Sequence, residues 1–305
     1  AKEKIMVYGD YDVDGTTAVA LVYKYLSNFY SNIDYFIPTR YEEGYGISSD
    51  IIDDFAGQGV KLVIILDCGI KANEEIAHAR EHGIDFIICD HHVPDQELPE
   101  AVAILNPKMP GSTYPCPHLS GCGVGYKLMQ AFAISNGIQQ NELEGMLDLV
   151  AVSIAADIVP MVDENRIMAF YGLRRLNTNP NMGLRAIIRI CNLSNREITI
   201  SDVIFKIGPR INASGRMQSG KEAVDLLVSR DVADAYERAK AIDQYNKDRK
   251  ELDKRITEEA NAIISSRHES ERDKKSIVIF NKDWHKGIIG IVASRLTELY
   301  YKPAV

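Results

Sequence analysis

Several features that would assign this chain to a special class are missing from its sequence. No run of about twenty apolar residues occurs, so we expect no transmembrane span. The five cysteines are odd in number and contain no Cys-x-x-Cys pair, which favours a reducing, cytoplasmic location over a disulfide framework. Internal repeats and low-complexity tracts are also absent. What is present is an ordinary globular composition, 46% hydrophobic and 26% charged.

Acidic residues outnumber basic ones, and the net charge is −8. Taken alone, this balance argues against a nucleic-acid partner. The argument loses force if bound metal neutralises several of the acids, because local basic patches decide more than the total charge does. At 305 residues the chain can hold one large or two ordinary domains. Predicted elements run almost to Ala1 and Val305, so we expect a fragment trimmed at both ends.

Short apolar runs alternate with helical patterns in the first hundred residues. The predicted strands are Ile5–Gly9, Ile33–Pro38, Leu62–Asp67, Phe86–Asp90 and Ala101–Asn106. The helices predicted between them are Thr16–Phe29, Ser48–Gly57 and Asn73–Glu81. This alternation predicts βαβ units and a parallel sheet, and therefore an α/β fold.

Beyond Gly121 the pattern becomes mostly helical. Helices are predicted over Val124–Asn136, Glu142–Asp157, Glu164–Leu176 and Gly183–Asn192. From Gly220 to about His268 the sequence has little glycine or proline and keeps one apolar face, which predicts a long connecting helix. A strand over Ser276–Phe280 and a helix beginning near Ile291 then predict the start of a second α/β domain.

Acidic and imidazole side chains follow three of the predicted strands at the point where each strand ends. They are Asp10, Asp12 and Asp14, then Asp67, then Asp90, His91 and His92. The carboxyl ends of parallel strands meet at one edge of the sheet, where open α/β sheets bind their ligands. So many like charges would repel one another unless cations lay between them. The sequence therefore predicts a metal site at this edge.

Asp157 is a further candidate ligand. It follows the almost wholly apolar stretch that begins at Leu147, and Pro160 ends the predicted helix there. A carboxylate is disfavoured at the carboxyl end of a helix, and burying one without a cation would cost on the order of several kcal/mol. Metal ligation explains such a residue; a helix cap or a hidden salt bridge is the alternative.

The types of candidate ligand indicate which metal would bind. Asp10–Gly15 superficially resembles a calcium loop, but Leu21 stands where the bidentate glutamate of that loop is required. Carboxylates with one or two imidazoles and no thiolate favour Mg²⁺ or Mn²⁺ over structural zinc. Two such ions sharing a bridging aspartate would activate water for phosphoester hydrolysis.

Four segments resemble the sequence motifs of the DHH phosphoesterases. They are Tyr8–Gly15, Asp67–Gly69, Asp90–His92 and Ala156–Pro160. Three more are similar to segments of the single-strand-specific 5′→3′ exonucleases of that family: Pro38–Gly46, Gly208–Arg216 and His285–Leu296. The resemblance implies a DHH catalytic domain over 1–205, a helical connector over 206–272 and the truncated start of a DHHA1 domain over 273–305.

The resemblance also implies a role for each motif residue. The metal ligands would be Asp12, Asp14, Asp67, His91 and Asp157, holding two divalent cations, Mn²⁺ or Mg²⁺. Asp67 would bridge the two ions, and His92 would contact the scissile phosphate, so both count as catalytic. Asp10 lies beside the site as an additional candidate ligand. Many relatives place histidine where this chain has Tyr8, which implies one imidazole fewer at the first metal.

Basic and polar residues of the later motifs would grip the DNA backbone. These are Arg40, Arg210, Asn212, Arg216, Ser294 and Arg295. The implied activity is stepwise 5′→3′ hydrolysis of single-stranded DNA to mononucleotides in repair and recombination. Single-strand-binding protein and a RecQ-type helicase are the partners implied, the chain acting as a monomer without a membrane. Because the second domain is cut short, we expect a weakened grip on long strands.

Two alternatives stay open at this point. One is a DHH hydrolase of short oligoribonucleotides, cyclic dinucleotides or pyrophosphate. The other is a catalytically silent relative that only binds nucleic acid, although all five predicted ligands are intact.

Overall fold

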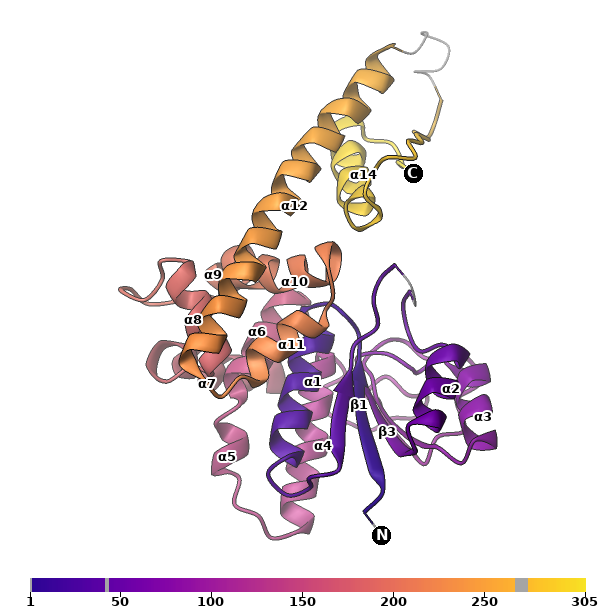
Figure 1. Cartoon of the computed structure of the whole chain (residues 1–305), viewed down its shortest axis with the longest axis vertical. Helices are drawn as coiled ribbons and strands as arrows, with labels where there is room; N and C mark the ends of the chain where they lie inside the picture. Colours follow the sequence, from indigo (N-terminus) through magenta and orange to yellow (C-terminus); the bar gives the residue numbers. More distant parts are fainter. Residues whose placement is uncertain (1, 42–43, 267–273) are drawn as a thin grey trace. The chain divides into compact units, whose positions relative to one another are not determined.

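The computed structural model describes residues 2–41, 44–266 and 274–305 (Figure 1). The chain divides into two compact units, one ending at Ile242 and the other beginning at Asp243. Each unit is described by itself. Among the described residues, no helix combines the length and the apolar character that crossing a bilayer would require.

A five-stranded parallel sheet forms the centre of the first unit. Its strands are β1 (Lys4–Gly9), β2 (Ile33–Phe36), β3 (Val60–Leu66), β4 (Asp85–Cys89) and β5 (Ala103–Leu105), in the order β2-β1-β3-β4-β5. All four neighbouring pairs are parallel. The α/β class and the five parallel strands predicted from the sequence are therefore confirmed.

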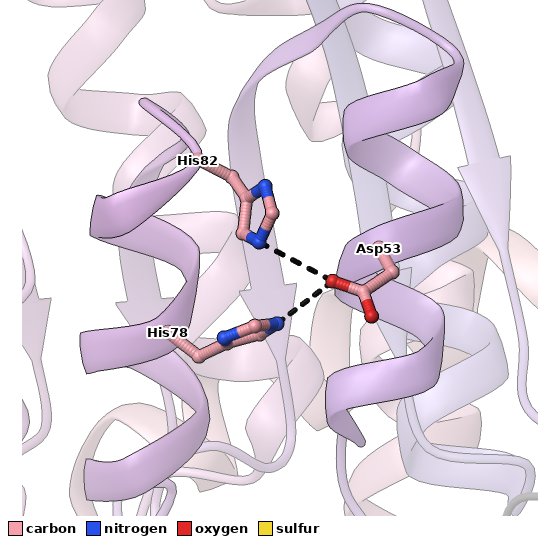
Figure 2. Close-up of side chains that lie close together, drawn as sticks. All are labelled: Asp53, His78 and His82. Carbon is pink, nitrogen blue, oxygen red and sulfur yellow. Dashed lines mark hydrogen bonds and ion pairs between the residues drawn. The ribbon is translucent and has the colours of Figure 1, made fainter.

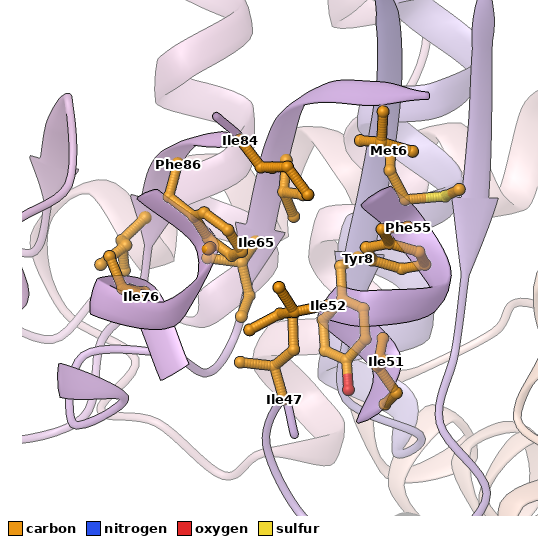
Figure 3. Packing of buried hydrophobic residues seen from close by; sticks show 14 of the residues in the cluster. Met6, Tyr8, Ile47, Ile51, Ile52, Phe55, Ile65, Ile76, Ile84 and Phe86 are labelled. Atoms are coloured by element: carbon orange, nitrogen blue, oxygen red, sulfur yellow. The ribbon is translucent and has the colours of Figure 1, made fainter. Parts of the chain in front are cut away.

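Helices cover both faces of this sheet. On one side lie α1 (Val13–Leu26) and α4 (Gly121–Ser135), and on the other lie α2 (Ser49–Gly57) and α3 (Asn73–Glu81) (Figure 1). Successive strand residues point to opposite faces, so Met6 and Tyr8 of β1 face α2 and α3. There they pack with Phe55 and Phe86 in a buried apolar cluster (Figure 3).

A helical layer follows the sheet in sequence. It consists of α5 (Asn141–Glu144), α6 (Leu147–Ala156), α7 (Asp163–Thr178), α8 (Met182–Ile190), α9 (Ile200–Asp202), the π-helix η1 (Val203–Ile207), α10 (Gly208–Met217) and α11 (Lys221–Val228). The single helix predicted over Glu142–Asp157 is wrong, because the chain turns at Gly145 and Met146 between α5 and α6. Glycine is a poor helix former, which makes it a natural point for this break.

The connecting helix α12 (Val232–Ser266) begins later than predicted. We expected one helix from Gly220, but α11 ends at Val228 and a new helix starts after Asp231. The Asp231 carboxylate accepts the Asp234 N–H at 2.8 Å, which caps this start. The predicted end near His268 lies outside the described residues.

The second unit contains the later part of α12 and helix α14 (Lys286–Tyr300). Arg295 pairs with the buried Asp253 at 2.7 Å and ties the two helices together. The predicted strand over Ser276–Phe280 is not formed as a regular strand. Within the described part of this unit, Ile277 and Ile279 exchange three backbone hydrogen bonds with Pro303 and Val305, which leaves one isolated parallel bridge, Ile277 to Ala304.

Helix α14 starts at Lys286, five residues earlier than the predicted start near Ile291. The helix includes Gly287 and Gly290, residues that usually disfavour a helix, and Gly287 is buried.

Candidate metal centre

The sheet register brings the predicted clusters to one edge. Gly9 pairs with Leu66 and Leu66 pairs with Cys89, so the last residues of β1, β3 and β4 lie in one row. The next residue after each strand is an aspartate: Asp10, Asp67 and Asp90. Three acidic side chains therefore leave the sheet side by side, at the edge where α/β folds bind their ligands.

Asp67 occupies a tight position at this edge. Its backbone φ is +61°, a left-handed conformation that aspartate tolerates better than most residues. Its N–H still donates to the Cys89 carbonyl at 2.9 Å, so the turn begins directly where the strand ends. The residue is only 3% exposed. The carboxylate is thus held inside the protein rather than in water.

Asp14 is fixed by the start of α4. Its two carboxylate oxygens accept the N–H groups of Gly121 at 2.6 Å and Cys122 at 2.8 Å, and Ser153 donates its hydroxyl at 2.6 Å. The first turn of a helix offers unpaired N–H groups and a partial positive charge, both of which stabilise an anion. Asp12 caps α1 in turn by accepting the Gly15 N–H at 3.0 Å.

His91 presents one ring nitrogen to the carboxylates. Its Nδ1 lies 3.0 Å from the Leu119 carbonyl, which can only accept, so Nδ1 carries the proton. In the neutral ring the lone pair is then on Nε2, the arrangement that metal-binding histidines use. Nε2 lies 3.1 Å from Asp67 Oδ1 and 3.7 Å from one oxygen each of Asp14 and Asp157.

These separations suit atoms that bind a common ion. Two ligand atoms, each about 2.1 Å from an octahedral ion and at right angles, lie about 3.0 Å apart. Asp14, His91 and Asp157 form one group whose ligand atoms all lie within 4.8 Å of one another, and Asp10, Asp12 and Asp67 form a second. Asp67 also groups with His91 and His92, so it contacts both sides of the cluster.

Unpaired oxygens and mutual repulsion show that the cluster fits divalent cations. Oδ1 of Asp10 and Oδ1 of Asp67 are buried without a hydrogen-bond partner among the described residues. Burial and the nearby Asp12 raise the pKa of Asp10 to about 7. Burial and the nearby Asp14 raise the pKa of Asp67 well above its usual value. A set of carboxylate oxygens with one imidazole is the donor chemistry of Mn²⁺ and Mg²⁺.

Asp157 differs from the sequence prediction in one respect. We expected it to be buried in a helix, but α6 ends at Ala156 and Asp157 is the capping residue, with 31% of its side chain exposed. Burial together with the Asp14 charge raises its pKa to about 6. The next residue, Ile158, has a φ of +56°, strained for a β-branched side chain. Asp157 therefore lies at the solvent side of the cluster.

Asp90 orients the second histidine. Asp90 Oδ1 lies 2.7 Å from His92 Nδ1 and accepts the backbone N–H groups of His91 and His92, while Oδ2 accepts that of Ile70. Burial alone would raise the pKa of Asp90, but the hydrogen bonds from His92 outweigh it and the pKa is lowered. The same hydrogen bond raises the pKa of His92. His92 is thus held as a proton donor beside the carboxylates.

A small cavity that contains two arginines adjoins the acidic cluster. Its volume is about 140 Å³, and it is lined by Asp10, Tyr11, Asp12, Arg40, Asn212, Gly215 and Arg216. The Arg40 guanidinium lies 4.3 Å from the centre of the Tyr11 ring. Asn212 accepts the Val13 N–H through its amide oxygen at 3.1 Å. Three predicted phosphate-binding residues therefore lie next to the predicted metal ligands.

The other predicted DNA-binding residues lie elsewhere. Arg210 is not among the residues lining this cavity, and its guanidinium donates to the Lys206 carbonyl at 2.8 Å. Ser294 and Arg295 belong to the second unit, where Ser294 donates to the Gly290 carbonyl and Arg295 pairs with Asp253. A role for these three in binding DNA stays a prediction.

Tyr8 contributes to the core instead of the acidic cluster. Its ring stacks on Phe36 with centroids 5.9 Å apart, and its hydroxyl donates to the Gly46 carbonyl at 2.6 Å. The sequence did not predict that Ser153 would hydrogen-bond Asp14 or that the Leu119 carbonyl would orient His91. The glycine-rich helix start at Ser120–Gly123 was the available signal, since such starts bind anions.

Comparison with known proteins identifies the family. Residues 4–154 match the DHH family, N-terminal domain. The chain is 40% identical to the single-stranded-DNA-specific exonuclease RecJ of Bacillus subtilis, over 100% of this chain and 38% of that protein. It is 35% identical to RecJ of Escherichia coli, over 99% of this chain and 54% of that protein. The chain belongs to the DHH family.

Within that family the chain is similar to RecJ over its whole length. A crystal structure of exonuclease RecJ bound to manganese matches with a TM-score of 0.88 and 29% identity, covering 99% of this chain and 75% of that one. The chain nevertheless spans only about half, or less, of the length of the two relatives named above.

Proposed function

We propose that this chain carries the catalytic centre of a single-stranded-DNA-specific 5′→3′ exonuclease that hydrolyses phosphodiester bonds with two divalent cations. The observation that carries the proposal is that Asp67, His91 and Asp157 lie close to the three aspartates that follow β1. The similarity to RecJ over the whole chain supports the choice of substrate.

Two groups of side chains would hold the cations, Mn²⁺ or Mg²⁺. Asp10, Asp12 and Asp67 form one group, Asp14, His91 and Asp157 form the other, and Asp67 is near enough to His91 to serve both. When bound, such ions supply a water nucleophile at neutral pH and stabilise negative charge on phosphoryl oxygens. This assignment includes Asp10, because its unpaired buried oxygen is explained by a ligand.

The protein's own groups orient the substrate around that centre. Asp90 favours the cationic form of His92, which can then donate to an oxygen of the scissile phosphate. Arg40, Asn212 and Arg216 would bind neighbouring phosphates from the adjoining cavity. Contacts with the sugar-phosphate backbone carry no sequence information, so hydrolysis is expected to be indifferent to base sequence.

The wider biological setting is proposed on family resemblance. It comprises release of mononucleotides from the 5′ end in DNA repair and recombination, action as a cytoplasmic monomer, and cooperation with single-strand-binding protein and a RecQ-type helicase. A hydrolase of small nucleotides or pyrophosphate is the competing function. The arginines beside the carboxylates favour a polymer, because they extend the binding surface beyond one phosphate.

A substrate comparison tests the proposal. The chain, supplied with Mn²⁺, is incubated with single-stranded DNA labelled at the 5′ end, the same strand labelled at the 3′ end, its blunt duplex, and a dinucleotide. Early release of labelled mononucleotide from the 5′-labelled single strand is expected, with little from the duplex. Faster hydrolysis of the dinucleotide than of the long strand would instead support the small-substrate function.

A further inference from the structure

A second cluster of metal-binding side chains lies outside the catalytic centre. Asp53 of α2, His78 of α3 and His82, which caps the end of α3, bring their donor atoms together between the two helices (Figure 2). His78 Nε2 lies 2.8 Å and His82 Nε2 lies 3.3 Å from the same oxygen, Oδ1 of Asp53. Two histidines four residues apart share one face of a helix, a spacing that recurs in zinc sites.

The distances already match those between ligands of one ion. Two atoms that each bind a tetrahedral ion at about 2.0–2.1 Å lie about 3.4 Å apart. The two imidazole rings are 4.7 Å apart, close enough to bind together. All three side chains are partly open to solvent, with exposures of 30% for His78, 38% for His82 and 56% for Asp53. An ion can therefore reach the cluster directly.

We propose that Asp53, His78 and His82 form a surface site for a borderline divalent metal of the Zn²⁺, Ni²⁺ or Cu²⁺ class. Two imidazoles and one carboxylate prefer these metals, whereas the carboxylate-rich catalytic centre prefers Mg²⁺ or Mn²⁺. Three protein ligands leave at least one coordination position for water.

The location of the site indicates a structural role. Helix α3 begins at Asn73, after the loop that follows β3 at the catalytic edge, and runs back along the sheet. His78 and His82 lie in its later half and at its end, away from that edge. A bound ion would join α2 to α3, the two helices that cover one face of the sheet (Figure 1). The site would therefore stabilise this layer without taking part in hydrolysis.

Metal titration in the presence of millimolar Mg²⁺ tests the proposal; the Mg²⁺ competes for the carboxylate centre, and the variants identify which binding belongs to the second cluster. Zn²⁺ alone is titrated calorimetrically into the parent chain and into three variants. His78→Ala and His82→Ala should each weaken zinc binding at least about tenfold. Removing a residue that only hydrogen-bonds a metal ligand already lowers metal affinity by about that factor, and each of these variants removes a ligand itself. The control His118→Ala removes an exposed imidazole outside the cluster and should leave zinc affinity unchanged.

Two further measurements separate metal binding from a simple ion pair. With one equivalent of Cu²⁺ as probe, coupling to imidazole nitrogen in the electron paramagnetic resonance spectrum should be stronger in the parent than in the His78→Ala, His82→Ala double variant, where the catalytic-centre imidazole can still bind the ion. Zn²⁺ should raise the melting temperature of the parent by about 5 °C more than that of the double variant. Mn²⁺-dependent nuclease activity should be equal in the two proteins. Equal zinc affinity in the parent and the double variant would overturn the proposal.

Discussion

The backbone N–H of Gly121 donates a 2.6 Å hydrogen bond to the carboxylate of Asp14. This contact joins the start of α4 to the start of α1, although more than one hundred residues separate them in sequence. The positive end of a helix thereby stabilises a carboxylate that three neighbouring acids would otherwise destabilise. Gly121 also lies against Asp67, and this second contact leads to the first prediction.

The substitution Gly121→Ala should damage catalysis. A Cβ at position 121 would lie 2.6 Å from both Cβ and Oδ1 of Asp67, so that carboxylate must shift. A displacement of about 1 Å in a catalytic group can cost about 100-fold in rate. We expect kcat with Mn²⁺ to fall on that order. Gly57→Ala is the matched control, because no atom lies within 4 Å of its added Cβ, and its activity should equal that of the parent.

Replacing Asp67 with asparagine should abolish hydrolysis yet stabilise the metal-free protein. Burial and neighbouring acids raise the pKa of Asp67, so its ionised form destabilises the folded chain at neutral pH. Without metal, Asp67→Asn should melt at a higher temperature than the parent; with Mn²⁺, the parent should gain more stability. Binding of single-stranded DNA should persist.

Asp85→Asn provides the control for that experiment, since Asp85 is an exposed acid at the opposite end of β4. It should change neither turnover nor the response to Mn²⁺. Turnover near the parent rate in Asp67→Asn would contradict a shared ligand role for Asp67.

Arg40→Ala should weaken DNA binding in a salt-dependent manner. The guanidinium lines the cavity beside Asp10 and Asp12, and its Nε is buried without a hydrogen-bond partner among the described residues. Loss of one phosphate contact should lower the slope of log affinity against log salt by about 0.7 for a single strand. Arg185→Ala removes the same charge from an exposed arginine paired with Asn179 and should leave the slope unchanged.

Asp202→Asn should reduce stability at neutral pH but not in strong acid. The hydrogen bond from the Arg196 guanidinium lowers the pKa of Asp202, and the same carboxylate accepts the Thr199 N–H at the start of α9. A lowered pKa means that this stabilisation is present above about pH 4 and is lost as the pH falls further. We expect a cost of about 1 kcal/mol at pH 7, as for other helix caps.

Urea unfolding of the parent and Asp202→Asn across the acid range measures this effect. The two unfolding free energies should converge as the pH drops below the usual carboxyl range. A difference that is the same at every pH would show that Asp202 acts by packing alone. Because α9 leads through η1 into α10, the variant should also affect how firmly Asn212 and Arg216 are held.

The sheet and the position of the acidic side chains at its edge were predictable because their signals are local. Each buried strand is a short apolar run, and the residue after it faces the edge where ligands bind, so Asp10, Asp67 and Asp90 followed from position alone. The contacts of Asp14 with Gly121 and Ser153 depend on how α1, α4 and α6 pack, and no local pattern reports that packing.

The errors near the end of the chain have a similar origin. Ser276–Phe280 has the composition of a strand, but within the described residues its pairing is limited to three backbone hydrogen bonds between Ile277, Ile279 and the segment 303–305. The break at Ser229 was missed because Asp231 resembles any other exposed acid until its cap on Asp234 is visible. Composition predicts an element's type better than it predicts where that element stops.

Main-chain atoms hold most of the acidic centre in position. Asp14 is bound by two backbone amides of α4, Asp12 by that of Gly15, and Asp90 by three others. Exchanging a side chain leaves such donors in place, whereas proline or a one-residue deletion removes or shifts them. The scaffold beneath the centre should therefore accept broad variation in residue type while allowing almost none in the length of the loops after β1 and β4.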